Sequence, residues 1–279
     1  EEAFQAGLTA LSKIAKTYLG VGVEQHSNAL GEAKNVELNV FDGPCPAGNV
    51  GVQVNNIDPV NKGEVVWTVD PASVIFFGRL FLTGKVDLHK KVAVAGSEMK
   101  QTGYANVLVG TPFSAFVEAQ LKTAEHVRLI NGNPLTGIKT TVADFVGGHT
   151  SEITAIPEGD DCDEMLGWIL PRTNQFSTSR SYLSWLFGKN KEYNLDARIK
   201  GGERHMIMSG EYDQVLPMDI FGEYLIKAII AGDIDKQEQL GIYEISPEDF
   251  AVAEFVDSSK LELQKIVREG LNILRKENA

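Results

Sequence analysis

The residues best suited to binding chemistry lie in one loop-like segment, GPCPAGNVG, which runs from Gly43 to Gly51. Glycines and prolines at this spacing would let backbone amides curl around an anion, as they do in phosphate-binding loops. A phosphate loop also needs a cation or a hydroxyl to hold its ligand, and neither follows here. The segment therefore predicts either a loop that faces a ligand or a plain turn. If it faces a ligand, the candidate residues are Pro44, Pro46, Gly48, Asn49 and Gly51.

Other groups of reactive side chains are typical of structure rather than of catalysis. The run from Asp160 to Glu164 gathers four carboxylates around Cys162, but it lacks the glycine and the spacing of a calcium loop and is typical of a solvated turn. The segment from Val92 to Ser97 resembles a strand that leads into a nucleotide-binding turn, yet its single glycine does not give the spacing that a dinucleotide requires.

The histidines give no metal-ligand spacing, because they are scattered along the chain as His26, His89, His126, His149 and His205. We therefore predict no metal site. We also predict no catalytic residue, although a Ser-His-Asp arrangement built from distant positions stays open.

The composition of the 279-residue chain argues against several classes of function. A formal net charge of −12 disfavours nucleic-acid binding, because such proteins need a basic face to displace counterions. The longest apolar stretch, from Val74 to Leu82, is about half the roughly 20 residues that a membrane-spanning helix needs. The two cysteines, Cys45 and Cys162, lie too far apart to build a zinc or iron–sulfur site alone. We expect a soluble chain of two or three domains that reaches a membrane only through partners.

Helices and strands alternate over the first part of the chain. Period-2 patterns and short apolar runs predict strands at residues 36–40, 49–57, 64–69 and 91–95. Helical spacing and start signals predict helices at residues 4–18, 71–82 and 111–121. This alternation favours crossover connections and a mostly parallel sheet, so residues 1–123 are assigned to an α/β domain.

The pattern changes after residue 123. Short strands are predicted at residues 128–130, 152–156 and 167–170, with turn-rich sequences between them. Because only residues 182–187 look helical, we assign residues 124–200 to a β-rich module of ubiquitin-like size.

The last part of the chain, residues 201–279, is predicted to be helical. One helix is expected over residues 221–231, and Ser246 with Pro247 marks the start of another. Ser259 is expected to cap the final helix. The apolar stripe of this helix is typical of packing against a domain core, and it consists of Leu263, Ile266, Val267, Leu271 and Leu274.

Long blocks of the sequence resemble a known family. These blocks are GPCPAGNVGVQVNNIDPV at 43–60, INGNPLTG at 130–137, GGERHMIMSGEYDQVLPMDI at 201–220, LIKAIIAGDIDKQEQLGIYEISPEDFA at 225–251 and EFVDSSKLELQKIVREGL at 254–271. They are similar, in the same order, to the NqrA family of subunits from the bacterial sodium-translocating NADH:quinone reductases. The resemblance covers essentially the whole chain, which is identified as a member of that family with an amino-terminal part missing.

The resemblance implies a fold class, α/β plus α+β. Related subunits of respiratory complex I and of the Rnf complex combine a Rossmann-like α/β part, a soluble-ligand-binding β-grasp module and a helical carboxy-terminal domain. The resemblance also implies a peripheral subunit on the cytoplasmic face of the bacterial inner membrane. Its partners would be the other subunits of a six-subunit complex that oxidises NADH, reduces ubiquinone or menaquinone and exports sodium, with quinone as a further candidate ligand.

The same resemblance implies that this chain binds no cofactor of its own. Related subunits keep cysteines for an iron–sulfur cluster where this sequence has Ala253 and Asp257. The glycine-rich flavin loop of the complex I subunit has no counterpart in the sequence. The complex would use NADH, flavins, an Fe–S cluster and quinone through its other subunits.

Three roles therefore stay open. In the first role, the chain is an accessory subunit without redox chemistry, is inactive alone and shapes the quinone-side environment of the complex. In the second role it is a redox subunit, and in the third it is a purely structural scaffold. In the redox role, the loop from Gly43 to Gly51 would hold quinone or a nucleotide in a site completed by the missing amino-terminal region. An uncharged loop of prolines and glycines suits quinone better than a nucleotide. In the scaffold role, the acidic tail would pair with basic loops of the membrane subunits.

Overall fold

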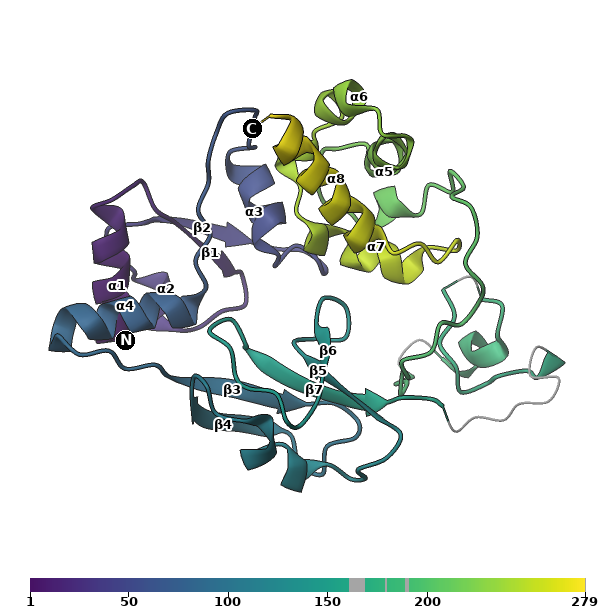
Figure 1. Ribbon diagram of the computed structural model, residues 1–279, viewed down its shortest axis with the longest axis horizontal. Coiled ribbons are helices and arrows are strands. Elements are labelled where there is room, and N and C mark those ends of the chain that lie inside the picture. Colours follow the sequence, from purple (N-terminus) through teal and green to yellow (C-terminus); the bar gives the residue numbers. More distant parts are fainter. Residues whose placement is uncertain (161–168, 179, 189–190, 279) are drawn as a thin grey trace. The chain divides into compact units, whose positions relative to one another are not determined.

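The computed structural model describes residues 1–160, 169–178, 180–188 and 191–278. The chain divides into two compact units, one formed by Glu1–Asp87 together with Gly201–Ala279 and the other by Leu88–Lys200. The fold is mixed α/β with a helical carboxy-terminal region (Figure 1). None of the helices in the described ranges combines the length and the apolar character that a bilayer crossing requires.

The first unit begins with an α/β part built on a two-stranded sheet. Its elements are α1 (Glu2–Ser12), β1 (Tyr18–Gly22), α2 (Asn28–Gly31), β2 (Glu37–Phe41), α3 (Val50–Ile57) and α4 (Pro71–Thr83). Strands β1 and β2 pair in parallel, and α1 packs against α4. This packing is close, because a methyl group on Gly78 would lie 1.6 Å from the carbonyl oxygen of Ala3. The carboxylate of Asp70 caps α4 by accepting a hydrogen bond of 3.0 Å from the Ser73 amide.

The predictions for this part are confirmed at β2 and α4 and are wrong at other elements. The first helix ends at Ser12, and Tyr18, the last residue expected in it, begins β1. The strand expected at 49–57 is the helix α3, whose Val52 and Asn55 are both buried at the three-residue spacing of one helix face. The segment forms a helix rather than a strand because this face packs on residues that are distant in the sequence.

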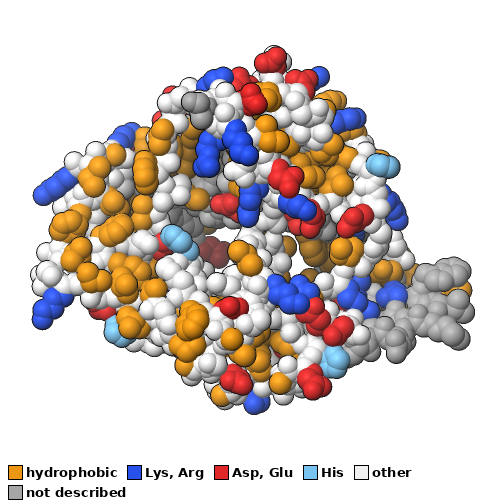
Figure 2. All heavy atoms as spheres, in the orientation of Figure 1, with side chains coloured by type: hydrophobic (Ala, Val, Ile, Leu, Met, Phe, Trp, Pro, Cys, Tyr) orange, Lys and Arg blue, Asp and Glu red, His pale blue; other side chains and the backbone are white. Residues whose placement is uncertain are grey.

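Residues 64–69, expected to be a strand, form neither a helix nor a strand in the structure. Their side chains include Trp67, which is 88% exposed. Helix α4 also exposes apolar side chains, among them Phe77 and Phe81. Figure 2 shows such side chains, in orange, on the left of the view where α1 and α4 lie.

The helical part of the first unit is assembled from short helices, where η denotes a 3-10 helix. They are η5 (Tyr212–Gln214), α5 (Gly222–Ala231), α6 (Ile234–Gln239), η6 (Ile242–Glu244), η7 (Pro247–Phe250), α7 (Ala251–Val256) and α8 (Leu263–Glu277). Their core includes Val52 from α3 together with Leu225, Ile226, Phe250, Leu263 and Val267. Helix α3 therefore joins the α/β part and the helical part into one unit.

Three of the four expected features of this part are confirmed, including the apolar stripe of the final helix, which packs on the core of this part. Residues 222–231 form α5, and Ser246 forms a capping box with Asp249 at the start of η7. The expected cap at Ser259 is wrong, since α8 begins at Leu263. The hydroxyl of Ser259 instead donates a hydrogen bond of 3.1 Å to the carbonyl oxygen of His205.

The second unit is built on a five-stranded mixed sheet. Its strands are β3 (His89–Ala95), β4 (Gly103–Leu108), β5 (Val127–Asn131), β6 (Ile138–Thr140) and β7 (Glu152–Pro157), in the spatial order β4-β3-β7-β5-β6. Strands β3 and β7 are parallel, and the other neighbours are antiparallel. A separate core covers one face of this sheet and includes Val92, Val94, Phe113, Val117 and Ile153.

The strands expected at 91–95, 128–130 and 152–156 are confirmed as β3, β5 and β7. The helix expected at 111–121 is wrong, because two 3-10 turns, η1 (Phe113–Ala115) and η2 (Glu118–Gln120), occupy that region. Residues 183–187 form a third one, η4 (Leu183–Phe187). The expected strand at 167–170 lies partly outside the described residues. The domain boundary drawn at residue 123 falls between β4 and β5 of a single sheet.

Candidate functional site

The segment from Gly43 to Gly51 forms a tight turn that leads into α3. Its amides bond within the turn, where Ala47 N donates to Pro44 O over 2.9 Å and Asn49 N donates to Pro46 O over 2.8 Å. Pro44 and Gly48 are exposed, whereas Pro46 is buried. The turn therefore uses some of the backbone donors that an anion-binding loop would direct toward a ligand.

The first turn of α3 packs against a second helix start in the carboxy-terminal part. The side-chain amide of Asn49 does not cap its own helix, and it donates instead to the carbonyl oxygen of Glu248 over 2.9 Å. A methyl group on Gly51 would lie 2.2 Å from Asp249 Oδ2 and 2.7 Å from Ser246 Oγ. Glycine at position 51 is thus required by the close approach of the two helix starts.

Asp249 brings a carboxyl group to the beginning of α3. It is fully buried, and its Oδ2 atom accepts hydrogen bonds from the amide and the hydroxyl of Ser246, at 2.8 and 2.7 Å. Its Oδ1 atom has no hydrogen-bond partner among the described residues. Burial raises the pKa of Asp249 above its ordinary value. The carboxyl group of Asp249 thus occupies the space beside the first turn of α3 that a phosphate would need.

Further along the segment, polar side chains continue the attachment to the helical part. Asn55 is 7% exposed and donates to Glu244 Oε2 over 2.7 Å. Lys62 forms an ion pair of 2.7 Å with Glu238. Residues 49–62 are therefore held along their length by groups about 180 to 200 residues away in the sequence.

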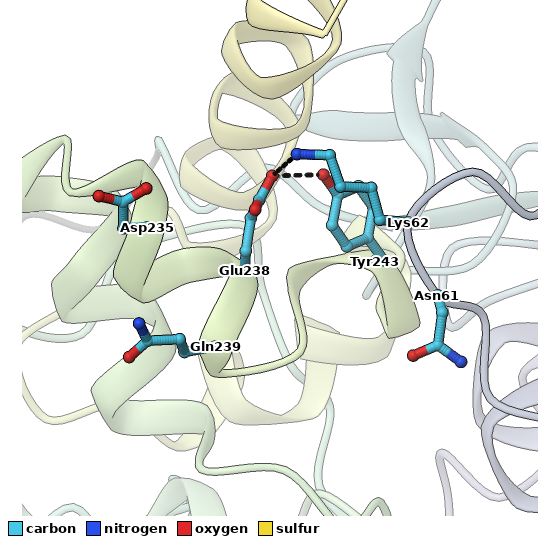
Figure 3. Close-up of a pocket in the computed structure, with 6 residues that line it drawn as sticks. All are labelled: Asn61, Lys62, Asp235, Glu238, Gln239 and Tyr243. Atoms are coloured by element: carbon cyan, nitrogen blue, oxygen red, sulfur yellow. Dashed lines mark hydrogen bonds and ion pairs between the residues drawn. The ribbon is translucent and has the colours of Figure 1, made fainter.

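A surface cavity of about 430 Å³ lies at the end of this segment (Figure 3). Its lining consists of Asn61, Lys62, Asp235, Glu238, Gln239 and Tyr243. Lys62 and Tyr243 both point toward Glu238, and the Tyr243 hydroxyl donates to Glu238 Oε1 over 2.6 Å. The hydrogen bond from Lys62 lowers the pKa of Glu238. Because every lining residue carries a polar or charged group, the cavity suits water and small polar solutes better than a quinone ring.

The second unit has a cavity of its own, of about 580 Å³. It is lined by Glu98, Thr123, Ala124, Glu125, His126 and Pro157. Nδ1 of His126 lies 2.8 Å from Asp160 Oδ1. Neither this cavity nor the one in Figure 3 includes any of the five candidate residues of the loop. Beyond Asp160, the acidic run to Glu164 lies outside the described residues.

Ala253 and Asp257 both have structural surroundings. Each is 1% exposed. The Asp257 carboxylate accepts hydrogen bonds from the amides of Ser259 and Leu261, at 3.1 and 2.8 Å, and so shapes the turn between α7 and α8. Burial, with the nearby Asp257 charge, raises the pKa of Tyr212. The carboxylate of Asp257 is thus bonded to the backbone of its own turn.

The loop has a recognisable pattern of glycines and prolines, but its contacts have no signal in the sequence. Ser246 is recognisable as a helix start, yet no local pattern indicates that this helix start meets Gly51. Glu238 and Tyr243 carry no motif either, because their partner Lys62 comes from a remote part of the chain.

Two family models match the chain. One, described as the NqrA second alpha/beta domain, matches residues 1–86, and the other, described as the NQRA C-terminal domain, matches residues 91–142. The two matches meet close to the division between the structural units at Asp87 and Leu88.

Curated relatives match nearly the full length of the chain. The NqrA subunit of the Na(+)-translocating NADH-quinone reductase is 35% identical over 277 residues in Vibrio atlanticus, 35% over 279 residues in Pasteurella multocida and 34% over 278 residues in Neisseria meningitidis. Each match covers 99% of this chain, and the chain spans 61 to 62% of the length of these relatives.

Proposed function

Because the chain belongs, over the domains it contains, to the NqrA family of Na(+)-translocating NADH-quinone reductase subunits, we propose that it serves as a peripheral subunit of such a complex. Its place is the cytoplasmic face of the bacterial inner membrane. The complex couples NADH oxidation and quinone reduction to sodium export, and its other subunits are the partners of this chain. The chain alone is expected to oxidise no NADH.

Within the complex, the proposed role is that of an accessory subunit that holds neither a flavin nor an iron–sulfur cluster. The observation that carries this proposal is the contact between α3 and η7. Gly51 leaves just enough room for the buried carboxyl group of Asp249, so the helix start that could have received a phosphate is already covered. The buried Ala253 and the turn-forming Asp257 support the same role.

The finer fold assignment is also a proposal. A Rossmann-like origin of the first part is supported by the parallel pair β1–β2 with helices around it. A β-grasp assignment for the second unit is supported by its strand order, in which the first hairpin lies beside the last strand. The first and last strands of that sheet, β3 and β7, run parallel, as a β-grasp requires.

The exposed tip of the loop suits contact with a partner. Pro44 and Gly48 are exposed, and the rigid attachment of α3 fixes the place at which they are presented. We assign to these two residues an interface with another subunit near the quinone side of the complex. Quinone itself is the second candidate for this tip, because its ring is uncharged and the tip carries no charged side chain.

Titration with FMN and with a soluble quinone tests the accessory role. The purified chain is expected to bind no FMN at a one-to-one ratio, as followed by quenching of flavin fluorescence and by absorbance after gel filtration. Tight stoichiometric FMN binding would overturn the claim. Saturable quinone binding that Pro44→Ala weakens, with Pro59→Ala as the control in the exposed turn after α3, would favour the quinone candidate over the protein interface.

A further inference from the structure

One stretch of the chain has a charge and an apolar pattern unlike the rest. From Met165 to Lys191 the sequence contains four basic residues and no Asp or Glu, in a chain whose formal net charge is −12. The described part of this stretch, residues 169–178, 180–188 and 191, is called the interfacial segment below. It exposes large apolar side chains, among them Ile169, Leu170, Trp185, Leu186 and Phe187.

The short helix η4, drawn in green in Figure 1, has an inverted burial pattern. Its polar residue, Ser184, is 2% exposed, while Trp185 and Phe187 are 49% and 62% exposed. Leu183 and Leu186 are also exposed. A helix that turned toward its own domain core would bury these apolar groups and expose the serine. The pattern indicates that η4 presents its apolar side chains to something outside the unit.

Basic groups lie beside the aromatic rings of the interfacial segment. The Arg180 guanidinium lies 5.9 Å from the centroid of the Trp185 ring, and Lys191 Nζ lies 5.3 Å from that of Phe187. The Arg172 guanidinium lies 5.6 Å from the Tyr182 ring. Lys191 also donates to Thr173 O and Asn174 Oδ1, at 2.6 and 2.9 Å, which are uncharged acceptors that leave its charge in place.

Exposed aromatic and aliphatic side chains beside basic groups are typical of segments that bind at membrane interfaces. Trp and Tyr rings settle at the level of the lipid headgroups, with neighbouring Arg and Lys groups against the phosphates. Anionic lipids attract each basic group near the surface, and an exposed apolar side chain gains by leaving water for the acyl boundary. A carboxylate in the segment would oppose this attraction, and its sequence contains none from Met165 to Lys191.

We propose that the interfacial segment binds the surface of a membrane that contains anionic phospholipids, with Trp185, Leu186 and Phe187 at the headgroup boundary and Arg172, Arg180 and Lys191 on the phosphates. A lipid surface fits better than a groove on a protein, because the apolar groups come from loops and one short 3-10 helix and each cluster of rings is accompanied by a cation. The acidic remainder of the chain is repelled by such a surface, so that this segment alone would approach it. The proposal goes beyond a peripheral subunit held only by its protein partners.

Co-sedimentation of the purified chain with lipid vesicles tests the proposal. One set of vesicles is pure phosphatidylcholine, and the other contains roughly three parts phosphatidylcholine to one part phosphatidylglycerol, a composition that carries negative surface charge. The chain is expected to bind the anionic vesicles and to dissociate as the salt concentration rises. Absence of binding to the anionic vesicles at low salt, or equal binding to both sets, would overturn the proposal.

Matched variants locate the contact. Arg180→Gln is expected to weaken binding to the anionic vesicles about fivefold, since one basic charge near the surface is lost. Trp185→Ser combined with Phe187→Ser is expected to weaken it by at least about tenfold. The controls are Arg268→Gln, an exposed arginine of α8, and Tyr104→Ser, an 81% exposed aromatic residue on β4 of the same unit. Circular dichroism and the unfolding temperature verify that each variant is folded.

The controls also decide against the competing interpretation, in which the segment docks on a protein. If the control variants reduce vesicle binding as much as the segment variants do, the proposal is wrong. It is equally wrong if the segment variants bind vesicles normally but fail to co-purify with the membrane subunits of the complex. Normal co-purification with lost vesicle binding supports the lipid contact and leaves the proposed function untouched, so that the two conclusions fail separately.

Discussion

Gly51 occupies a position at which a side chain has no room. A methyl group there would lie 2.2 Å from Asp249 Oδ2, whereas a methyl group on Gly48, three residues earlier, would meet no atom within 4 Å. Gly51→Ala is therefore expected to destabilise the protein by about 1–3 kcal/mol, since well-packed sites tolerate added atoms poorly. Gly48→Ala should change stability by less than about 0.5 kcal/mol. The free energies of unfolding of the two variants, obtained from urea unfolding curves, test this difference.

The same contact makes a double-mutant test available. Asp249→Ala removes the atom nearest to the added methyl group and leaves Ser246 Oγ at 2.7 Å, so the alanine at position 51 should cost less in that background than in the natural chain. The coupling between the two changes is expected to be at least about 0.5 kcal/mol. Equal costs in both backgrounds would show that Gly51 is needed for another reason, and would remove the main support for a covered helix start.

Arg128 and Glu158 form an ion pair whose contribution to the stability of the fold depends on pH. The hydrogen bonds from Arg128 lower the pKa of Glu158 from its ordinary 4.5 to about 2. Because the folded state binds this proton less tightly than the unfolded state does, the pair stabilises the fold fully above pH 4.5 and loses its effect as the pH falls toward 2.

Glu158→Gln should therefore reduce stability by about 1 kcal/mol at neutral pH, the scale of a partly exposed bidentate pair. Near pH 2 the variant and the natural chain should be equally stable. The midpoints of unfolding of the variant and the natural chain, measured between pH 2 and neutral pH, test this expectation. The control is Glu125→Gln, which changes an exposed carboxylate of the same unit. A difference that persists unchanged at pH 2 would contradict the assignment.

At the scale of elements, the sequence predicted β2, α4, α5 and the helix start at Ser246 because each is specified by local signals. It failed at α3, where valines at 50, 52 and 54 alternate as in a strand. The deciding interactions are remote, since Val52 enters the core of the helical part and Asn49 bonds to Glu248. The candidate loop was found for its glycines and prolines, but its role depends on Asp249, for which the sequence offers no nearby signal. Local patterns cannot specify partners about 200 residues away.

The crossing of α1 and α4 offers a test at this scale. In a helix interior, changing glycine to alanine usually stabilises by about 1 kcal/mol. At Gly78 the added methyl group would lie 1.6 Å from the backbone oxygen of Ala3, so α1 and α4 would have to separate. Steric overlap with backbone outweighs propensity, and Gly78→Ala is expected to cost at least about 2 kcal/mol.

The control for this change is Gly103→Ala in β4, where a methyl group meets no atom within 4 Å. The midpoint temperature of unfolding should fall clearly for Gly78→Ala and change little for the control. A stabilised Gly78→Ala protein would mean that α1 and α4 do not cross as closely as described.

At the scale of the whole molecule, the chain leaves its first unit at Asp87 and re-enters it at Gly201. Each unit has its own large buried core, and a smaller cluster of Phe4, Leu8 and Val74 lies in the α/β part of the first unit. The family models meet near the same division. The helical part and the α/β part of the first unit are tied through α3, so damage to α3 should reach both. The sheet of the second unit has a core that α3 does not enter.

Substitutions in the two cores should therefore act separately. Val52→Ala removes two buried methyl groups from the core that α3 shares with α5 and α8, and is expected to cost about 1–3 kcal/mol. Hydrogen exchange should then accelerate in α3, α5 and α8, because units that unfold together lose protection together, while β3 and β7 stay protected. Val92→Ala, which is also fully buried, should produce the opposite pattern. Loss of protection across both units from either change would mean that the chain unfolds as one cooperative body, and the partition of its stability into two cores would have to be abandoned.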